Sequence, residues 1–341
     1  MEPDVPDSVV ERARSVVADL GVSKDVRLAE SLVSEALGLI TDQPDTLDLK
    51  IATAALTEMR AAYSVFAPFR DERKVSIFGS ARTKPDDPLY DQARRLAADL
   101  ADRGWMTVTG AGPGIMEAGM EGAGRDRSIG VSIRLPFESG ANSIIAGDHK
   151  HVSMKYFFTR KLMLVKESQA FVCLPGGVGT LDETFELLTL TQTGKGLPVP
   201  IVLLDAPGDD YWESVDALIR NQLVPRGLVS PDDTGLYTIT DSADVACEII
   251  ERFYSNYHSI RFVGDRLVVR MQQGPTDAQL DDVNDRFAHL LASGRIERSG
   301  PSKLEQREDD ELELDRLAFD FTKHGYGDLI AMIGDINSWV A

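Results

Sequence analysis

The sequence predicts an α/β protein built on a Rossmann-like, doubly wound parallel sheet. Short apolar runs alternate with segments of helical periodicity between residues 71 and 256, and such alternation is typical of a parallel sheet covered on both faces. Three of the runs end in glycine-rich turns, after Phe78, Thr109 and Leu174. In an open α/β fold these turns lie at the carboxyl edge of the sheet, where ligands bind.

A helical extension is expected before this core. Residues 1–70 show helical periodicity in three segments, 8–19, 24–40 and 46–66, and no convincing strand. We therefore assign residues 1–70 to a separate N-terminal part.

The core itself, residues 71–256, is expected to alternate strictly between strands and helices. Strands are predicted at 75–78, 106–109, 128–135, 170–174 and 199–204, and helices at 89–102, 115–123 and 155–167, with another helix beginning in the turn at 175–183. Residues 257–341 are predicted to form a small α+β appendage. Its expected elements are strands at 266–270 and 316–321, a helix at 277–292, and a solvated acidic loop at 305–315.

Length and charge restrict the function. At 341 residues the chain can bury a large core. It carries 55 acidic and 36 basic residues, for a formal net charge of −19, which opposes attraction to nucleic acid or to anionic membranes. A small anionic ligand would need local cations and backbone N–H groups.

Cysteine use and hydropathy indicate a soluble, cytoplasmic protein. Cys173 falls in a predicted core strand and Cys247 on a predicted helix, so both are expected to be buried thiols rather than disulfide or metal ligands. The acidic N-terminus lacks an apolar signal core, and no run approaches the roughly 18 apolar residues of a membrane span.

The most informative motif is PGGVGTLDE at residues 175–183, which joins an apolar run to an amphipathic helix. Glycines without Cβ let anion oxygens reach backbone N–H groups, and the start of a helix favours negative charge. A purely phosphate-binding turn gains nothing from a nearby carboxylate. Glu183 is therefore a candidate for chemistry.

The ordered set formed by Gly79-Ser80, the loop 110–116, Arg160-Lys161 and the segment 175–183 resembles the LOG ("lonely guy") family over residues 70–255. The resemblance implies a Rossmann-like homodimer, or a higher homo-oligomer, that acts as a phosphoribohydrolase. Its substrates would be nucleoside 5′-monophosphates, cytokinin ribotides or AMP among them, cleaved to free base and ribose 5-phosphate without metal or organic cofactor. Relatives were labelled lysine decarboxylases, but this sequence has no recognisable pyridoxal-phosphate lysine context.

The resemblance also assigns residues to roles. The catalytic pair would be Arg160 and Glu183. The phosphate-binding turn would comprise Gly176, Gly177, Gly179 and Thr180; other substrate contacts would come from Gly79, Ser80, Gly112, Gly114 and Met116, with Lys161 in support.

These residues suit cleavage of an N-glycosidic bond. Positive charge develops on the ribose as the bond breaks, and a carboxylate at Glu183 would stabilise it or deprotonate the attacking water. Arg160 is a planar fork of donors that could orient Glu183, the ribose or the phosphate. The phosphate would serve as a binding handle, so nucleosides without it are expected to be poor substrates.

Other interpretations stay open for single residues. Glu183 could be a first-turn glutamate favoured by the helix dipole, and Arg160 a surface salt-bridge residue. Glu186 and Glu117 could contact ligand or simply face solvent. The sequence 149–151, His-Lys-His, is expected to be an exposed loop rather than a metal site. Met154, Met163 and the aromatics at 156–158 are expected to form a core-facing stripe rather than a platform for a base.

Two further classes of protein are compatible with a nucleotide pocket. One is a carrier or sensor that binds a nucleotide without hydrolysing it, which would have no need for Glu183 beside an anion. The other is a dinucleotide-dependent oxidoreductase, which the turn after Phe78 disfavours because it lacks the G-x-G-x-x-G spacing.

Overall fold

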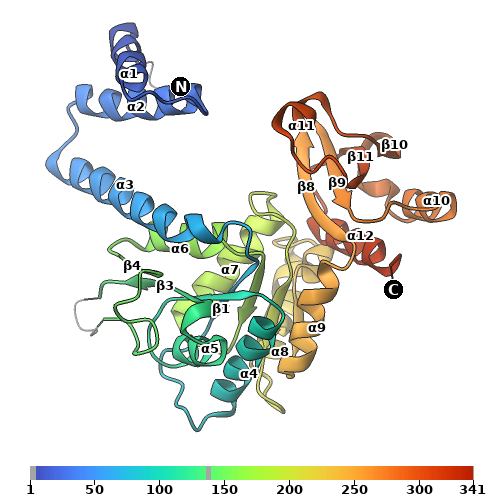
Figure 1. Cartoon of the computed structure of the whole chain (residues 1–341). Coiled ribbons are helices and arrows are strands. Elements are labelled where there is room, and N and C mark those ends of the chain that lie inside the picture. The colour runs from blue at the N-terminus through green and yellow to red at the C-terminus, as the bar shows by residue number, and fades with distance from the viewer. Residues whose placement is uncertain (1–4, 136–139, 341) are drawn as a thin grey trace. The chain divides into compact units, whose positions relative to one another are not determined.

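The computed structural model describes residues 5–135 and 140–340 and divides into two compact units, residues 1–60 and 61–341 (Figure 1). The first unit contains α1 (Asp7–Asp19), α2 (Val26–Thr41) and most of α3 (Thr46–Phe66). The first two helices pack together through Val9, Ala13 and Val17 on α1 and small residues on α2. The three predicted N-terminal helices are confirmed to within two residues, while the domain boundaries at 70 and 257 stay predictions.

The second unit contains the predicted parallel sheet. Its strands are β1 (Lys74–Phe78), β2 (Met106–Thr109), β3 (Ser128–Ile133), β4 (His151–Met154), β5 (Ala170–Cys173), β6 (Ile201–Leu204) and β7 (Thr238–Thr240). They lie in the order β4-β3-β2-β1-β5-β6-β7, every neighbouring pair parallel. The chain thus runs outward from β1 to β4 and then returns to the other side of β1 with β5. This reversal between β1 and β5 is the switch point of a doubly wound fold.

Helices cover both faces of this sheet. They are α4 (Pro88–Asp102), α5 (Ile115–Ala123), α6 (Phe157–Lys166), α7 (Val178–Gln192), α8 (Tyr211–Leu218) and α9 (Ala243–Phe253). Successive side chains of β1 point to opposite faces of the sheet, which shows which helices cover each face. Ile77 packs in the apolar cluster with α4, α5 and α9. The Ser76 hydroxyl points the other way and donates to the Leu164 carbonyl of α6 at 2.9 Å.

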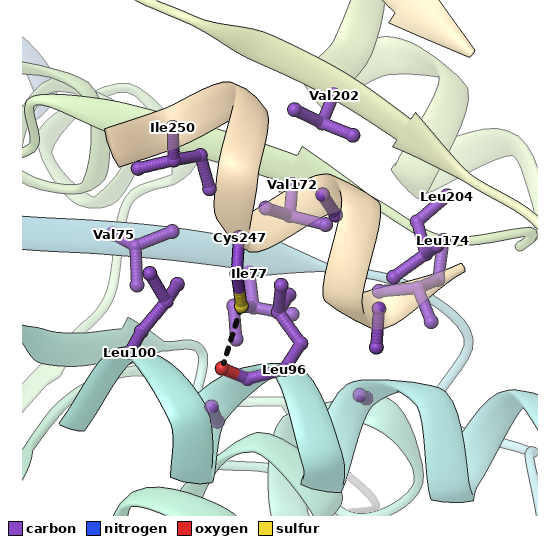
Figure 2. Packing of buried hydrophobic residues seen from close by; sticks show 14 of the residues in the cluster. Val75, Ile77, Leu96, Leu100, Val172, Leu174, Val202, Leu204, Cys247 and Ile250 are labelled. Carbon is purple, nitrogen blue, oxygen red and sulfur yellow. Dashed lines mark hydrogen bonds between the residues drawn. The ribbon is translucent and has the colours of Figure 1, made fainter. Parts of the chain in front are cut away.

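The apolar cluster on the α4–α9 face holds the sheet to its helices (Figure 2). Val75, Ile77 and Val172 are fully buried there, and each such side chain contributes about 1.5–3 kcal/mol. Cys247 of α9 sits among them, its thiol 3.7 Å from the Leu96 carbonyl of α4. The prediction that both cysteines are buried and unpaired is confirmed.

Both edge strands of this parallel sheet were missed by the sequence prediction, as were the strands at 257–263 and 291–299 in the C-terminal part. The strands β4 (HVSM) and β7 (TIT) are partly exposed and contain no run of apolar residues, so neither stands out in the sequence. Because β4 occupies residues 151–154, the helix predicted at 155–167 is shorter and begins at Phe157, and the strand predicted at 128–135 ends at Ile133.

The C-terminal part contains a four-stranded antiparallel sheet in the order β10-β11-β9-β8. The strands are β8 (Tyr257–Val263), β9 (Arg266–Met271), β10 (Leu291–Ser299) and β11 (Asp315–Phe321), and the helices are α10 (Asp277–Arg286), α11 (Lys303–Glu308) and α12 (Tyr326–Ser338). The helix predicted at 277–292 was too long, because the chain turns after Arg286 and enters β10 at Leu291.

The solvated loop predicted at 305–315 was wrong for its first residues, whereas residues 309–314 do lie outside helices and strands. Its first residues belong to α11, and Glu305 is completely buried. Arg270 of β9 and Arg316 of β11 lie directly opposite each other in the antiparallel register, and both donate to Glu305 Oε1, at 2.6 and 3.3 Å. Two opposed buried cations require an anion between them, which draws this glutamate inward.

Loss of the Glu305 charge is expected to destabilise the protein. Burial opposes its ionisation, but hydrogen bonds from Ser302, Arg270 and Arg316 outweigh burial and lower the pKa to about 2. This contribution to stability is therefore present above the ordinary glutamate pKa and is lost as the pH falls towards 2. Glu305→Gln should cost about 3 kcal/mol at pH 7 in thermal or chemical unfolding, and the deficit should shrink in acid.

Glu308→Gln is the matched control, since Glu308 is on the same helix and 43% exposed. Exposed pairs contribute about 0–1 kcal/mol. Equal melting temperatures for Glu305→Gln and wild type would contradict the assignment.

None of the helices among the described residues has the length and apolar character that a membrane crossing requires.

Candidate active site

Three glycine-rich turns meet at the switch point of the sheet. They follow β1, β2 and β5, the strands on either side of the chain reversal. The Ser80 amide donates to the Pro175 carbonyl at 3.3 Å, and the Ile115 amide donates to the Ser80 carbonyl at 3.1 Å. Ser80 thereby links all three turns through backbone hydrogen bonds.

The approach of these turns is too close for side chains. A Cβ on Gly114 would lie 2.3 Å from the Ser80 carbonyl oxygen, and this residue has φ +68°. A Cβ on Gly79 would lie 2.7 Å from Ile115, and one on Gly176 would lie 2.2 Å from the Thr180 hydroxyl. Glycine at these positions is therefore a packing requirement.

Two glycines of the same motif have open space around them. An added Cβ on Gly177 or Gly179 would meet nothing within 4 Å. Gly177 is the N-cap of α7, and no side chain caps this helix start. The start of α7 thus combines an uncapped helix terminus with open space beside two glycines, and an uncapped helix terminus is the kind of arrangement that attracts anions.

The side chains of Arg160 and Glu183 form a buried ion pair between α6 and α7. Arg160 Nη1 lies 3.1 Å from Glu183 Oε1, and Arg160 Nε donates to the Val131 carbonyl at 3.0 Å. Arg160 is 8% exposed, so the surface salt-bridge interpretation was wrong. Glu183 lies beyond the first turn of α7, which contains no acidic residue, so the first-turn interpretation was wrong too.

The electrostatics of Glu183 are set by two opposing effects. Burial raises the pKa of this carboxyl above its ordinary value, while the charges of Arg160 and Lys161 and a hydrogen bond from Arg160 lower it; the net shift is upward. A carboxylate whose pKa is raised towards neutrality is a better proton acceptor than an ordinary one. Such perturbed groups cluster at functional sites.

Lys161 follows Arg160 in the sequence but forms ion pairs with carboxylates other than Glu183. Its Nζ lies 2.6 Å from both Asp182 Oδ2 and Glu186 Oε2. Burial lowers the pKa of Lys161, but the two carboxylates outweigh burial and raise it. Two carboxylates of α7 thus already compensate the positive charge of Lys161. Glu186, which the sequence left as either a ligand contact or a solvent-facing residue, contacts this lysine.

The loop after β2 closes over Arg160. A Cβ on Gly110 would lie 2.1 Å from Arg160 Nη2, and one on Gly112 would lie 2.7 Å from the Met116 methyl carbon. Asn142 holds this loop from outside, since its amide nitrogen Nδ2 donates to the Gly112 carbonyl at 3.1 Å. Sequence reasoning missed Asn142 and the steric role of Gly110, because both depend on segments that meet only in three dimensions.

The methionines and aromatics that were expected to form one core-facing stripe differ in their burial. Met154 and Met163 are fully buried, as predicted, but Phe157 and Phe158 are 55% and 54% exposed, so the core-facing interpretation was wrong for these two aromatics. They stand in the first turn of α6, before the helix reaches the sheet.

The exposed loop predicted at 149–151 is confirmed only for His149. Lys150 is buried against Asp148, and His151 begins β4, where it bonds Ser132 Oγ at 2.8 Å. Glu117 lies half-buried in the first turn of α5. In residues 5–135 and 140–340, no group of three or more His, Cys, Asp or Glu side chains is placed to hold a metal.

Fold and site together define a Rossmann-like α/β protein with a helix start that no side chain caps and a buried Arg–Glu pair at its switch point. The family described as "Possible lysine decarboxylase" matches residues 111–250. The rice protein "Probable cytokinin riboside 5'-monophosphate phosphoribohydrolase LOGL3" is 32% identical over 54% of this chain and 86% of its own length. The chain belongs to the LOG family.

Similar relatives occur in other organisms. The cytokinin riboside 5'-monophosphate phosphoribohydrolase of Mycobacterium tuberculosis is 30% identical over 45% of this chain and 81% of its own length. LOG1 of Arabidopsis thaliana, which carries the same enzyme name, is 28% identical over 55% and 87%.

Among solved structures, the molybdenum cofactor binding protein of Rippkaea orientalis matches with a TM-score of 0.38 and 19% identity, over 53% of this chain and 96% of its own. The molybdenum cofactor carrier protein of Chlamydomonas reinhardtii matches with a TM-score of 0.37 and 18% identity, over 53% and 97%. These scores are too low to support an inference about function.

The close packing at Gly110 leads to a structural prediction. Gly110→Ala would drive a methyl group into Arg160 Nη2, and overpacking of this kind costs about 1–3 kcal/mol. We expect a lower melting temperature by calorimetry. Gly177→Ala is the control, because open space surrounds Gly177 and its φ of −85° suits any residue. A Gly110→Ala variant that melts with wild type would show that Arg160 is not confined by this loop.

Proposed function

We propose that the protein hydrolyses the N-glycosidic bond of nucleoside 5′-monophosphates, releasing free base and ribose 5-phosphate. The observation that carries the proposal is the buried Arg160–Glu183 pair beside the open glycine turn. Relatives named as cytokinin riboside 5'-monophosphate phosphoribohydrolases support the same reaction. Cytokinin ribotides and AMP are the substrates we propose to test first.

The phosphate is proposed to bind at the start of α7. The N–H groups of Gly177 through Thr180 and the positive end of the helix dipole attract it, while the open faces of Gly177 and Gly179 leave room for its oxygens. Lys161 already pairs with carboxylates, so the backbone supplies much of the attraction. Energy from this remote contact would position the sugar against Glu183.

Glu183 is proposed to act on the ribose and on water. As the bond from the anomeric carbon to the base nitrogen breaks, its electron pair leaves with the base and positive charge grows on the ribose. The Glu183 carboxylate stabilises this charge and accepts a proton from the attacking water, and the leaving base gains a proton. Arg160, held by the Val131 carbonyl, fixes the carboxylate in one orientation.

The catalytic proposal predicts that both members of the pair are needed. General-base help contributes about 10²–10⁴-fold to rate, so Glu183→Ala and Arg160→Ala should each lower base release by at least about 100-fold in a chromatographic assay. The panel should contain adenosine, guanosine and pyrimidine 5′-monophosphates and a cytokinin ribotide. Glu248→Ala on α9 is an exposed control.

Absence of base release from every member of the panel, with monophosphate binding retained, would refute the hydrolase. It would leave a nucleotide carrier or sensor.

We also propose that the protein is a homodimer joined through α6. Phe157, Phe158 and Leu162 expose 55%, 54% and 43% of their surfaces. Phe158 and Leu162 also line a groove of about 760 Å³, which is bounded by α6, α7 and parts of the segments 195–199 and 254–259. Apolar side chains gathered on one helix indicate an interaction surface.

Light scattering after size exclusion tests the dimer. A charge at its centre would be desolvated without a partner, so Leu162→Asp should shift the mass from two chains to one. Val245→Asp, on α9 and similarly exposed at 42%, should leave it unchanged. A wild-type mass of one chain would contradict the proposal.

A further inference from the structure

The turn after β5 is held from outside by a tyrosine that takes no part in the proposed reaction. The Tyr211 hydroxyl, at the start of α8, donates to the Gly176 carbonyl oxygen at 2.8 Å. This carbonyl shares its peptide unit with the N–H of Gly177, the N-cap of α7.

Peptide geometry connects this contact to the anion-accepting face. In a planar trans peptide the carbonyl and the N–H point in opposite directions. A Gly176 carbonyl fixed towards Tyr211 therefore fixes the Gly177 N–H away from Tyr211. Glycine at both positions leaves the peptide free to rotate in the absence of such a contact.

Tyr211 is itself held in place by its neighbours. Asp205, directly after β6 and 2% exposed, accepts a hydrogen bond from the Trp212 amide at 3.1 Å. The Trp212 ring is fully buried and meets the Tyr211 ring edge-on, with centroids 4.9 Å apart. The start of α8 is thus anchored one residue away from the tyrosine.

We propose that Tyr211 is a positioning residue for phosphate, acting through the Gly176–Gly177 peptide to aim the Gly177 N–H at the 5′-phosphate of the substrate, with Asp205 as its anchor. The inference rests on the proposed function only in placing a phosphate at this turn. Tyr211 has no direct role in bond cleavage.

The environment of Asp205 indicates that its carboxylate is retained for function, because burying it costs stability. Asp205 Oδ1 is buried without a hydrogen-bond partner among the described residues. Burial and the nearby charges of Asp209, Glu213 and Asp210 raise the pKa of Asp205 to about 6 against the hydrogen bond from Trp212. Its contribution to stability is therefore lost as the pH rises through about 6, so a charged Asp205 costs stability at neutral pH.

The test compares Tyr211→Phe with Tyr237→Phe in the full-length protein. Tyr237 also carries a hydrogen-bonded phenol, which donates to Asp216 at 2.6 Å and does not reach the turn. Dissociation constants for inorganic phosphate, AMP and adenosine are measured by calorimetry. Loss of one hydrogen bond in Tyr211→Phe should weaken phosphate and AMP binding about three- to tenfold, while adenosine binding stays unchanged.

Steady-state kinetics give a second measurement of the same effect. Tyr211→Phe should raise KM for a monophosphate with little change in kcat, because ground-state and transition-state binding of the phosphate weaken together. Tyr237→Phe should change neither constant. Unchanged phosphate affinity in Tyr211→Phe, equal losses for AMP and adenosine, or a wild type that binds AMP no more tightly than adenosine would each overturn the proposal.

Variants of Asp205 test the anchor. Asp205→Asn keeps an acceptor for the Trp212 amide and should retain phosphate affinity, with an equal or higher melting temperature at neutral pH. Asp205→Ala removes the acceptor of the Trp212 amide and should weaken phosphate binding as much as Tyr211→Phe does. The double variant of Asp205→Ala and Tyr211→Phe should bind phosphate no more weakly than either single variant. Additive losses would show that Asp205 does not act through Tyr211.

The binding measurements separate the two proposals. Phosphate affinity that falls in Tyr211→Phe, in a protein that releases no base, would uphold the positioning role and refute the hydrolase. Base release with phosphate affinity unchanged in Tyr211→Phe would do the reverse.

Discussion

The buried ion pair between Arg160 and Glu183 is the interaction on which the candidate site depends. Removing either charge from water is costly unless the other is present, and the Val131 carbonyl and the loop at Gly110 restrict Arg160 further. The pair joins α6 to α7 beside the glycine turn. The same contact therefore supports the packing of two helices and holds a carboxylate of raised pKa beside the ligand-binding edge of the sheet.

A chain with a net charge of −19 needs a local means of binding an anion. The lysine next to Arg160 pairs with Asp182 and Glu186, so its charge is already compensated. Backbone N–H groups carry no competing counter-charge, and the start of α7 presents them where two glycines leave space. At the proposed phosphate site this arrangement would favour a small phosphate over a polyanion, because the attraction is confined to one turn.

The family membership could be predicted from ordered motifs, since glycine turns and an Arg-Lys pair retain their spacing in the sequence. The central strands β1, β2 and β5 could be predicted because each is fully buried and leads into a glycine-rich turn that marks its end. The edge strands β4 and β7 could not, since they are partly exposed and contain no run of apolar residues. The burial of Glu305 could not be predicted either, because an acidic run indicates solvent exposure unless the opposing arginines are known.

The sequence by itself determined the alternation of strands and helices and the positions of the three glycine turns, because these features depend on local periodicity and motif spacing. Its resemblance to the LOG family pointed to Arg160 and Glu183, but only the tertiary structure decided that the two side chains form an ion pair. Only the tertiary structure decided which glycines pack against neighbours and which leave space, and that Lys161 is paired. It also decided that Asn142 and Tyr211 brace the turns. Those facts depend on segments far apart in the chain, which meet only when the sheet forms.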